Sequence, residues 1–442
     1  MKKGMFFALA ASSLLFSACS SDDAVVSTEG QNEAVQQIVL QVASSGDGLT
    51  TRAGRPLYSS QALQTIQHVR VLIYDTATKK IVKDEKLDWT KSLTYTNHGR
   101  QLTFNYKGDK RLEAGSYKVM AVGYSEGSDY TYALDVKGQA DLTGSTYSDI
   151  TATLEAGKEA EEVFAGDADL KIGDDKKITN LTTGEENGVA VTLHRQVAGS
   201  FGYFQNIPAS VNGKAAATLR LVVRGKNDVL TFNNFNSSFT TTGNTIKHCV
   251  NGSTSTGEAL ATTDKFSNGD NGYVLYSIDL KKWFPQLDEN GDGLLNAEDA
   301  SWNHPGDVKT QVVKGSVFGS NFVIPFNYAK GKNTMELQLL DAKNNIIKTW
   351  TVSIPKDDVN TDATNGNVAD ASPSIFNVVR NHMYNLGVKT SNGTTTDPDP
   401  NKPDPDKPKP GTDEPEDLTK SQNLILKVND NWETIHKLEL GD

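Results

Sequence analysis

Short apolar segments separated by Gly, Asn and Asp residues recur along this chain, and they constrain its fold more than any other feature. The segments are rich in β-branched and aromatic residues and alternate apolar with polar positions, which is typical of half-buried β-strands. Helical periodicity is scarce beside them. The pattern predicts an all-β protein built from β-sandwiches, with strands in the ranges 36–42, 68–74, 102–106, 117–124, 219–223, 272–276, 335–339 and 378–388.

Chain length and one biased segment suggest how the sequence is divided. The 442 residues are enough for two or three domains, and we place a boundary between two sandwiches near residue 200. The N-terminal sandwich would span 53–200 and the C-terminal sandwich 201–390. Residues 391–416 contain seven of the 14 prolines, interleaved with Asp and Lys, so we expect a Pro-rich, extended linker there.

The first residues indicate export and lipidation. Two lysines precede an apolar stretch at residues 5–16, and small residues then lead into Cys19. The stretch is shorter than the roughly 20 residues that a membrane-spanning helix needs, and polar residues follow it at once. We therefore interpret residues 1–18 as a lipoprotein signal peptide and Cys19 as the lipid acceptor. A plain secretory signal with an incidental cysteine is the alternative.

Cysteine content, charge and motifs narrow the chemistry further. Only Cys249 remains once Cys19 is modified, so no intrachain disulfide can form even in an oxidising compartment. The net charge of -11 argues against nucleic acid as a partner. The sequence contains no HExxH, GxSxG, P-loop or dinucleotide motif, and its histidines are scattered, so we expect no enzymatic activity.

The C-terminal segment, residues 417–442, becomes apolar again after the linker. It is too short to form a core of its own, so its large apolar side chains need a partner surface. Burying five of them would contribute about 10 kcal/mol before ordering costs. The segment either adds as a donor strand to an open sheet edge of another molecule or folds back onto its own chain. The candidate donor-strand residues are Leu424, Leu426, Val428, Trp432, Ile435 and Leu438.

Residues 288–299 fit a calcium-binding loop of twelve residues. Oxygen-bearing side chains occupy loop positions 1, 3, 5, 9 and 12, a backbone carbonyl is available at position 7, and Gly293 stands at the sharp turn. Position 12 is Asp rather than Glu, and nearby prolines leave little room for flanking helices, so the loop is closer to a dockerin-type loop than to a sensor EF-hand. We expect structural calcium here, with an unoccupied acidic turn as the alternative. The predicted ligands are Asp288, Asn290, Asp292, Leu294, Asn296 and Asp299.

In their order and spacing, the motifs resemble the fimbrillin family of type V pilins from gut and oral anaerobes, and particularly its minor-fimbria shaft-like subunits. The acidic pair after Cys19 also resembles the surface-export signal of lipoproteins in these bacteria. The resemblance covers nearly the whole chain. Besides the Cys19 region and the tail around Trp432, the segments that carry it are 36–42, 51–53, 112–117, 193–198 and 380–386.

The resemblance implies two tandem transthyretin-like β-sandwich domains and a mechanism of assembly. An arginine-specific, trypsin-like protease cuts after a loop arginine, the first strand leaves, and the donor strand of another subunit fills the exposed groove. Arg52 and Ala53 match the cleavage position, and Pro56 makes Arg55 a poor alternative. Residues 19–52 would then be a lipidated propeptide that contains the first strand. Arg52 as an ordinary exposed loop residue is the other interpretation.

The resemblance therefore implies a structural subunit of a fimbrium (pilus) that serves adhesion, in the shaft or at the tip. An anchor fits less well, because an anchor must keep its lipid. The expected partners are other copies of the chain, related pilin subunits, the arginine-specific protease and, through the lipid before processing, the cell outer membrane. The rival hypothesis is a surface glycan- or matrix-binding lipoprotein that stays monomeric.

Overall fold

The protein is almost entirely β. Its structure is a computed structural model that describes residues 35–42, 66–89, 94–96, 99–182, 188–224, 227–232, 239–242, 245–248, 265–270, 272–306, 308, 312–324, 335–353, 383–388, 414–420, 423–425 and 427–429. Within these ranges the helical elements are η1 (Gly108–Lys110), η2 (Ala133–Asp135) and α1 (Leu280–Trp283). No helix of the described ranges is long and apolar enough to cross a membrane. The predicted all-β class is confirmed, whereas the tandem transthyretin-like arrangement stays a prediction.

Eight strands from the first half of the chain are hydrogen-bonded in the order β3-β2-β6-β9-β10-β1-β5-β4. Strand β10 connects two parts of this sheet, because its last two residues pair with β9 and its preceding residues pair with β1. The two parts pack around one core, to which β1, β2, β5, β6, β9 and β10 all contribute. The bounds are β1 (Gln36–Val42), β2 (His68–Asp75), β3 (Ile81–Asp88), β4 (Thr94–Thr96), β5 (Gly99–Tyr106), β6 (Gly115–Tyr124), β9 (Phe164–Ile172) and β10 (Gly188–Arg195).

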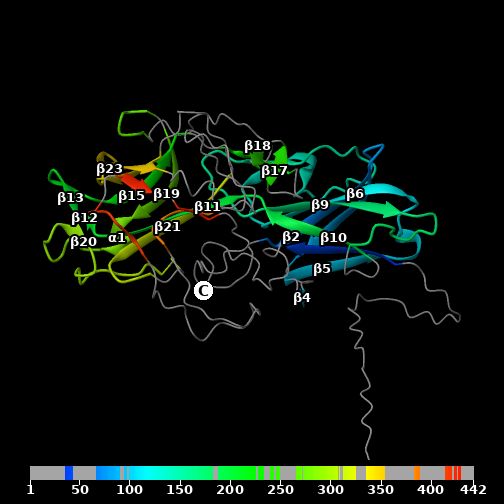
Figure 1. Ribbon diagram of the computed structural model, residues 1–442, viewed down its shortest axis with the longest axis horizontal. Helices are drawn as coiled ribbons and strands as arrows, with labels where there is room; N and C mark the ends of the chain where they lie inside the picture. Colours follow the sequence, from blue (N-terminus) through cyan, green and yellow to red (C-terminus); the bar gives the residue numbers. More distant parts are fainter. Residues whose placement is uncertain are drawn as a thin grey trace, which may run out of the picture.

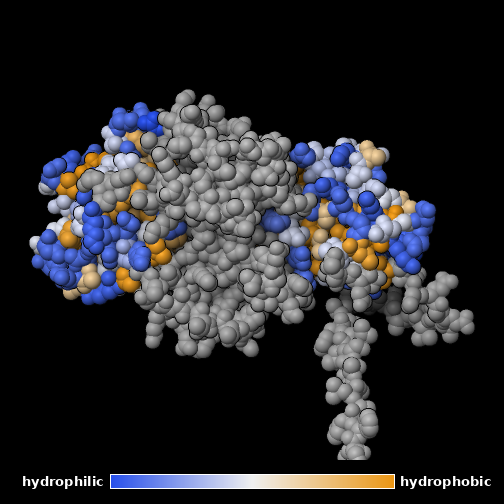
Figure 2. Space-filling model, in the orientation of Figure 1, coloured by the Kyte–Doolittle hydropathy of each residue, from blue (hydrophilic) through white to orange (hydrophobic). Residues whose placement is uncertain are grey.

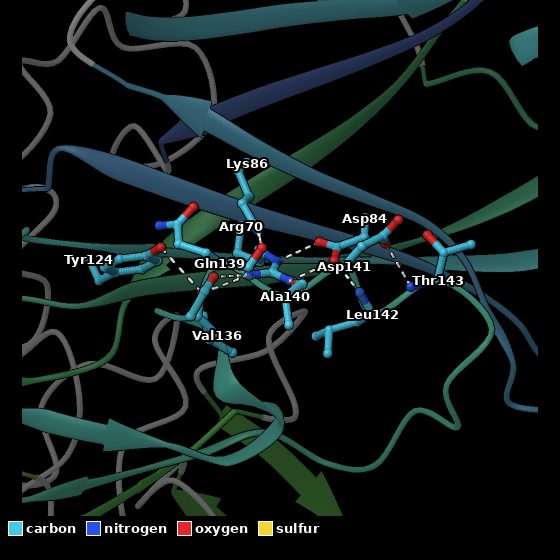
Figure 3. A network of polar contacts seen from close by, with 11 residues as sticks. Arg70, Asp84, Lys86, Tyr124, Val136, Gln139, Ala140, Asp141, Leu142 and Thr143 are labelled. Atoms are coloured by element: carbon cyan, nitrogen blue, oxygen red, sulfur yellow. Dashed lines mark hydrogen bonds and ion pairs between the residues drawn. The ribbon is translucent and has the colours of Figure 1, made fainter.

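Strand β2 is buried on both faces. Val71 faces the core that contains β1, whereas Leu72 and Arg70 face the opposite side, as strand alternation requires. There Arg70 forms a buried ion pair with Asp84 on β3. The guanidinium also donates to the carbonyls of Val136, Gly138 and Ala140, and the N–H of Leu142 donates to Asp84 (Figure 3). This network holds the segment 136–142 against the side of the sheet that β1 does not touch.

A small sheet, β16-β8-β7, connects the two halves of the chain. Strand β16 comes from beyond residue 200 and pairs antiparallel with β8, so that Val229 opposes Thr153. The second hydrophobic core runs from the outer face of β2 through this sheet into the C-terminal half. The bounds of these strands and of a separate hairpin are β7 (Tyr130–Tyr132), β8 (Thr151–Leu154), β16 (Val229–Thr231), β17 (Phe239–Thr242) and β18 (Thr245–His248).

Two five-stranded sheets form the C-terminal half. One has the order β21-β11-β24-β27 with β25 also paired to β11, and the other has the order β19-β15-β22-β23-β26. The two sheets approach closely at Gly202 and Gly319, which oppose each other in β11 and β21. Glycine is needed at both positions, because a Cβ atom on either would overlap a side chain of β19. The bounds are β11 (Ala198–Gln205), β15 (Thr218–Val223), β19 (Tyr273–Asp279), β21 (Ser316–Val323), β22 (Met335–Leu340), β23 (Ile346–Ser353), β24 (Met383–Leu386), β25 (Glu416–Asp417), β26 (Asn423–Ile425) and β27 (Lys427–Asn429).

Figure 1 shows the two halves at opposite ends of the long axis, with β2, β5, β6, β9 and β10 at one end and β15, β19, β21 and β23 at the other. Strand β11 lies between them, and it begins only three positions after β10 ends at Arg195. The predicted domain boundary near residue 200 stays a prediction. Strand β16, which follows this position, returns to pair with β8, which precedes it. The remaining short strands are β12 (Ile207–Pro208), β13 (Ser210–Val211), β14 (Lys214–Ala215) and β20 (Leu294–Leu295).

Candidate functional site: the β1 slot and the C-terminal tail

Strand β1 is an inserted strand with partners on both sides. It runs parallel to β10, with Leu40 opposite Val191, and antiparallel to β5, with Leu40 opposite Leu102. Ile38 and Leu40 are completely buried and belong to the core between the two parts of the sheet. We call the space between β5 and β10 that β1 fills the β1 slot.

One end of the β1 slot is a polar pocket that holds the side-chain amide of Gln36. The amide nitrogen donates to the carbonyls of Leu112 at 3.0 Å and Lys176 at 2.9 Å. The amide oxygen accepts from the N–H of Leu112 at 2.7 Å. Gln36 is 1% exposed, so these contacts replace all of its hydrogen bonds with water. The pocket therefore matches a group that has two donors and one acceptor.

Two loops build this pocket. Leu112 precedes β6, and Lys176 lies in the turn that follows β9, where it has a φ of 59°. The Nζ of Lys176 lies 2.5 Å from a carboxylate oxygen of Glu113, and this ion pair joins the two loops on the outside. At the other end of β1, Gln41 donates to the hydroxyl of Thr192 at 3.1 Å and accepts from the amide of Gln101 at 3.3 Å.

The beginning of the C-terminal segment is docked on its own chain. Strand β26 pairs parallel with β23, and β27 pairs antiparallel with β24, so the segment lies at one edge of each C-terminal sheet. Leu424 is completely buried in the second core. Just before it, β25 pairs with β11, and Asp417 accepts from Asn206 at 2.9 Å and from Thr419 at 2.6 Å.

The predicted calcium loop is compact and held by its own polar groups. Asp288 accepts from the N–H of Gly293 at 3.0 Å, and Asp299 accepts from the N–H groups of Glu289 and Asn296, each at 2.9 Å. Hydrogen bonds from the Asn296 side chain and the Leu294 N–H lower the pKa of Asp292. The six predicted ligand residues thus lie in one compact loop, which includes the short strand β20.

One atom of the loop fits a bound cation. The Oδ1 of Asp288 is buried and has no hydrogen-bond partner among the residues that the structure describes, which is unusual for a carboxylate oxygen. No group of three or more His, Cys, Asp or Glu side chains in the described ranges, the three aspartates of this loop included, is arranged to hold a metal ion. The predicted set also relies on two asparagines and a backbone carbonyl, which are ordinary calcium ligands.

Several predicted residues lie outside the described residues: Cys19, Arg52, Ala53, Leu426, Trp432, Ile435 and Leu438. Val428 lies in β27, and Leu424 is the donor-strand candidate whose burial is described. Sequence reasoning missed Gln36, because a glutamine at the start of an apolar strand looks like a solvated end. It also missed Asp417, whose partner Asn206 is far away along the chain.

Large hydrophobic side chains are rarely exposed in the described part of the chain. Leu181, at 45% exposure, is the exposed large hydrophobic residue of the described ranges. Figure 2 shows hydrophilic and hydrophobic residues intermixed over both described ends of the molecule.

No protein-family model matches the chain, and no curated protein matches it. Matching solved structures include the fimbrial anchor protein Mfa2 from Porphyromonas gingivalis, at 10% identity and a TM-score of 0.31, over 83% of this chain and 94% of that one. The tip fimbrial protein Mfa3 from Porphyromonas gingivalis, with a C-terminal truncation, matches at 9% identity and a TM-score of 0.31, over 80% and 94%. A fimbrial assembly protein from Parabacteroides distasonis matches at 12% identity and a TM-score of 0.33, over 81% and 92%.

All three of these structures are described as fimbrial proteins. Their identities and TM-scores are low, so the function has to be inferred from the chain's own residues.

Proposed function

We propose that this chain is a structural subunit of a cell-surface fimbrium, and that it polymerises by exchanging β1 for the C-terminal strand of another copy. The observation that carries the proposal is the position of β1, which is buried between β5 and β10 near the start of the chain. A single cut in the chain between β1 and β2 would leave β1 attached only by non-covalent contacts.

Loss of β1 would leave an unstable groove. Ile38, Val39 and Leu40 are each at most 2% exposed, and burying such side chains stabilises a protein by about 2 kcal/mol each. Their departure would uncover apolar side chains of β5 and β10 together with two rows of unpaired backbone groups. Open strand edges of this kind pair readily with another strand.

Processing supplies the cut in this proposal. The chain is exported as a lipoprotein, held at the outer face of the outer membrane through lipid on Cys19, and cleaved between Arg52 and Ala53 by an arginine-specific protease. Cleavage removes the lipid and β1 together, since both precede Arg52. The subunit is thereby released from the membrane and made competent for assembly in one step.

Transfer of the tail is favoured by the number of strand partners. On its own chain, each of β26 and β27 is an edge strand that pairs with one of the described strands. In the β1 slot a strand has a partner on both sides along its length, as β1 does. Because a strand in the slot gains a second hydrogen-bond ladder, the slot of a second copy is the more stable location for the tail.

Calcium has a structural role in the proposal. The loop at 288–299 would bind Ca²⁺ through Asp288, Asn290, Asp292, Leu294, Asn296 and Asp299. The unpartnered Oδ1 of Asp288 supports this assignment. The loop includes β20, which pairs with β12 next to β11, so an ion there would stabilise the C-terminal half and leave the β1 slot unchanged.

Two matched variants test the processing step. In cells that carry the protease, Arg52→Gln should abolish cleavage and leave monomers that retain Cys19, whereas Arg55→Gln should assemble normally, because Pro56 already protects that bond. N-terminal sequencing of surface material identifies the cleaved bond. Assembled chains that begin near Cys19 would contradict the proposed cleavage.

Deletion of residues 417–442 tests the donor role. The truncated chain should be exported and cleaved but should run as a monomer on a gel without heating, where the full chain forms a ladder of heat-labile polymers. Ladders of normal length from the truncated chain would refute the donor role. A monomeric full chain that binds glycans would favour the rival hypothesis of a surface-binding lipoprotein.

A further inference from the structure

The tail contains a near-copy of β1. Strand β1 has the sequence QQIVLQV, and residues 422–428 have the sequence QNLILKV. Position by position, Gln36, Leu40 and Val42 recur unchanged, and the other apolar positions exchange one aliphatic side chain for another of similar size. Both segments place a glutamine two residues before the first inward-facing aliphatic residue.

The copy preserves the two faces of the strand. In β1 the residues that are most deeply buried toward the core alternate: Gln36, Ile38 and Leu40. Gln37 and Gln41, which lie on the other face of the strand, are only half-buried. In the same alignment the tail would present Gln422, Leu424 and Leu426 to the core and would keep Asn423 and Lys427 on the other face.

Other registers conflict with the slot. A shift of one residue turns the opposite face inward and would bury the charge of Lys427, which is costly without a partner. A shift of two residues would bring either Leu424 or Lys420 to the site of Gln36. Neither side chain carries both donors and an acceptor, so the carbonyls and N–H group of that pocket would lose their partners.

We propose, on the basis of the strand exchange proposed above, that residues 422–428 of a second copy enter the β1 slot in one specific register. Gln422 takes the site of Gln36, Leu424 that of Ile38, and Leu426 that of Leu40. The incoming strand runs parallel to β10 and antiparallel to β5, as β1 does. The amide of Gln422 donates to the carbonyls of Leu112 and Lys176 and accepts from the N–H of Leu112.

Cysteine cross-linking measures this register. Val39 opposes Thr103 in β5. In the proposed register Ile425 takes the place of Val39, so Ile425 of the incoming tail should oppose Thr103. Thr103 is exposed, and a cysteine there is accessible to an oxidant. Directly opposed strand residues have Cβ atoms about 4.5–5.5 Å apart, near the range of a disulfide, whereas diagonal neighbours are about 7–8 Å apart. The full chain is used with Cys249→Ser and is cleaved by a trypsin-like protease, which removes Cys19.

The variant Thr103→Cys with Ile425→Cys should give covalent ladders after oxidation that survive heating and collapse on reduction. Thr103→Cys combined with Asn423→Cys or with Lys427→Cys should give few cross-links. Stronger cross-linking of either control pair would overturn the register. A cross-link confined to monomers would overturn the assignment to a second copy.

The glutamine site is tested separately with equal changes of charge. Gln422→Glu buries a carboxylate against two carbonyls, so its incorporation into polymers should fall by about tenfold or more, equivalent to about 1.4 kcal/mol. Asn423→Asp adds the same charge on the outer face and should assemble within about twofold of the parent chain. Equal losses in the two variants would contradict the register. If the parent chain forms no polymer after verified cleavage at Arg52, the proposed function itself fails.

Discussion

Arg195 and Glu162 form an ion pair in which Nε lies 2.8 Å from Oε1, and both side chains are completely buried. The pair lies where the chain leaves β10 and is about to enter β11. The guanidinium carbon also lies 5.1 Å from the centre of the Phe164 ring. The passage between the two halves is therefore held by a charged contact inside the protein.

Removing one member of this pair should be strongly destabilising. Arg195→Met leaves Glu162 as a buried charge without its counter-ion, and we expect the free energy of unfolding to fall by about 3–5 kcal/mol. Substituting both residues with Met should recover part of this loss, because no lone charge remains. Denaturant unfolding of the parent chain, Arg195→Met, Glu162→Met and the double variant measures the cycle. Lys158→Met, which breaks the exposed ion pair with Asp129, should change stability by less than about 1 kcal/mol.

A methyl group at Gly202 should disturb the contact between the C-terminal sheets. The Cβ atom of Gly202→Ala would overlap Tyr276 and Phe204, and overpacking of this kind costs about 1–3 kcal/mol. Gly127→Ala is the matched control, because a Cβ atom there meets nothing within 4 Å. Thermal unfolding compares the two variants. Equal melting temperatures would mean that the sheets can separate without cost.

The strands could be predicted from sequence because their signal is local. The predicted strand at 36–42 has the same bounds as β1, since a short run of β-branched and apolar residues marks a strand without reference to its partners. The partners of Gln36 were beyond such reasoning, because Leu112 is 76 and Lys176 140 positions away. Arg195 lies in the segment 193–198 that carries the family resemblance, yet nothing in that segment indicates that Glu162 is its ion-pair partner.

The loop at 288–299 and the C-terminal tail also differ in how far along the chain their contacts reach. The hydrogen bonds of the loop at 288–299 join residues at most ten to twelve positions apart, so spacing alone predicts that its polar side chains converge. The tail could not be located from sequence, because its apolar pattern fits any open sheet edge. Its docking on β23 and β24 depends on which edges the rest of the fold leaves available.

The attachment of the tail should depend on pH through Asp417. Burial alone would raise the pKa of this carboxyl, but hydrogen bonds from Thr419, Asn206 and Lys420 outweigh it and lower the pKa from 3.8 to about 2. Because the docked pKa is the lower one, docking of 414–420 is fully stabilised above pH 4 and weakens as the pH falls toward 2.

Hydrogen-exchange protection of residues 417–420, corrected for the intrinsic rate at each pH, measures this change. In Asp417→Asn the segment should be less protected at neutral pH and should show little further loss between pH 4 and 2. A parent chain whose protection is constant across that range would contradict the assigned role of Asp417.

Calcium should stabilise the chain through the loop at 288–299. A ligand that binds only the folded state stabilises it by about 2.7 kcal/mol at 100 times its Kd, so the melting temperature should rise by several degrees relative to a chelator. Asp288→Asn or Asp292→Asn should abolish this rise. Asp341→Asn is the control, because Asp341 also organises an exposed turn through Asn345 and Lys343 but lies outside the loop. No calcium-dependent shift in the parent chain would argue against the site.

The stability of uncleaved chains should depend on Gln36 far more than on its neighbour. Gln36→Leu fills a similar volume, but it leaves the N–H and carbonyl of Leu112 and the carbonyl of Lys176 without their partner inside the protein. Because an unsatisfied buried polar group costs about 1–3 kcal/mol, we expect a loss of about 2–4 kcal/mol. Gln37→Leu changes the other face of β1 and should stay within about 0.5 kcal/mol. Denaturant unfolding of the two variants before cleavage gives the comparison, and equal effects would show that the polar pocket does not hold β1 in place.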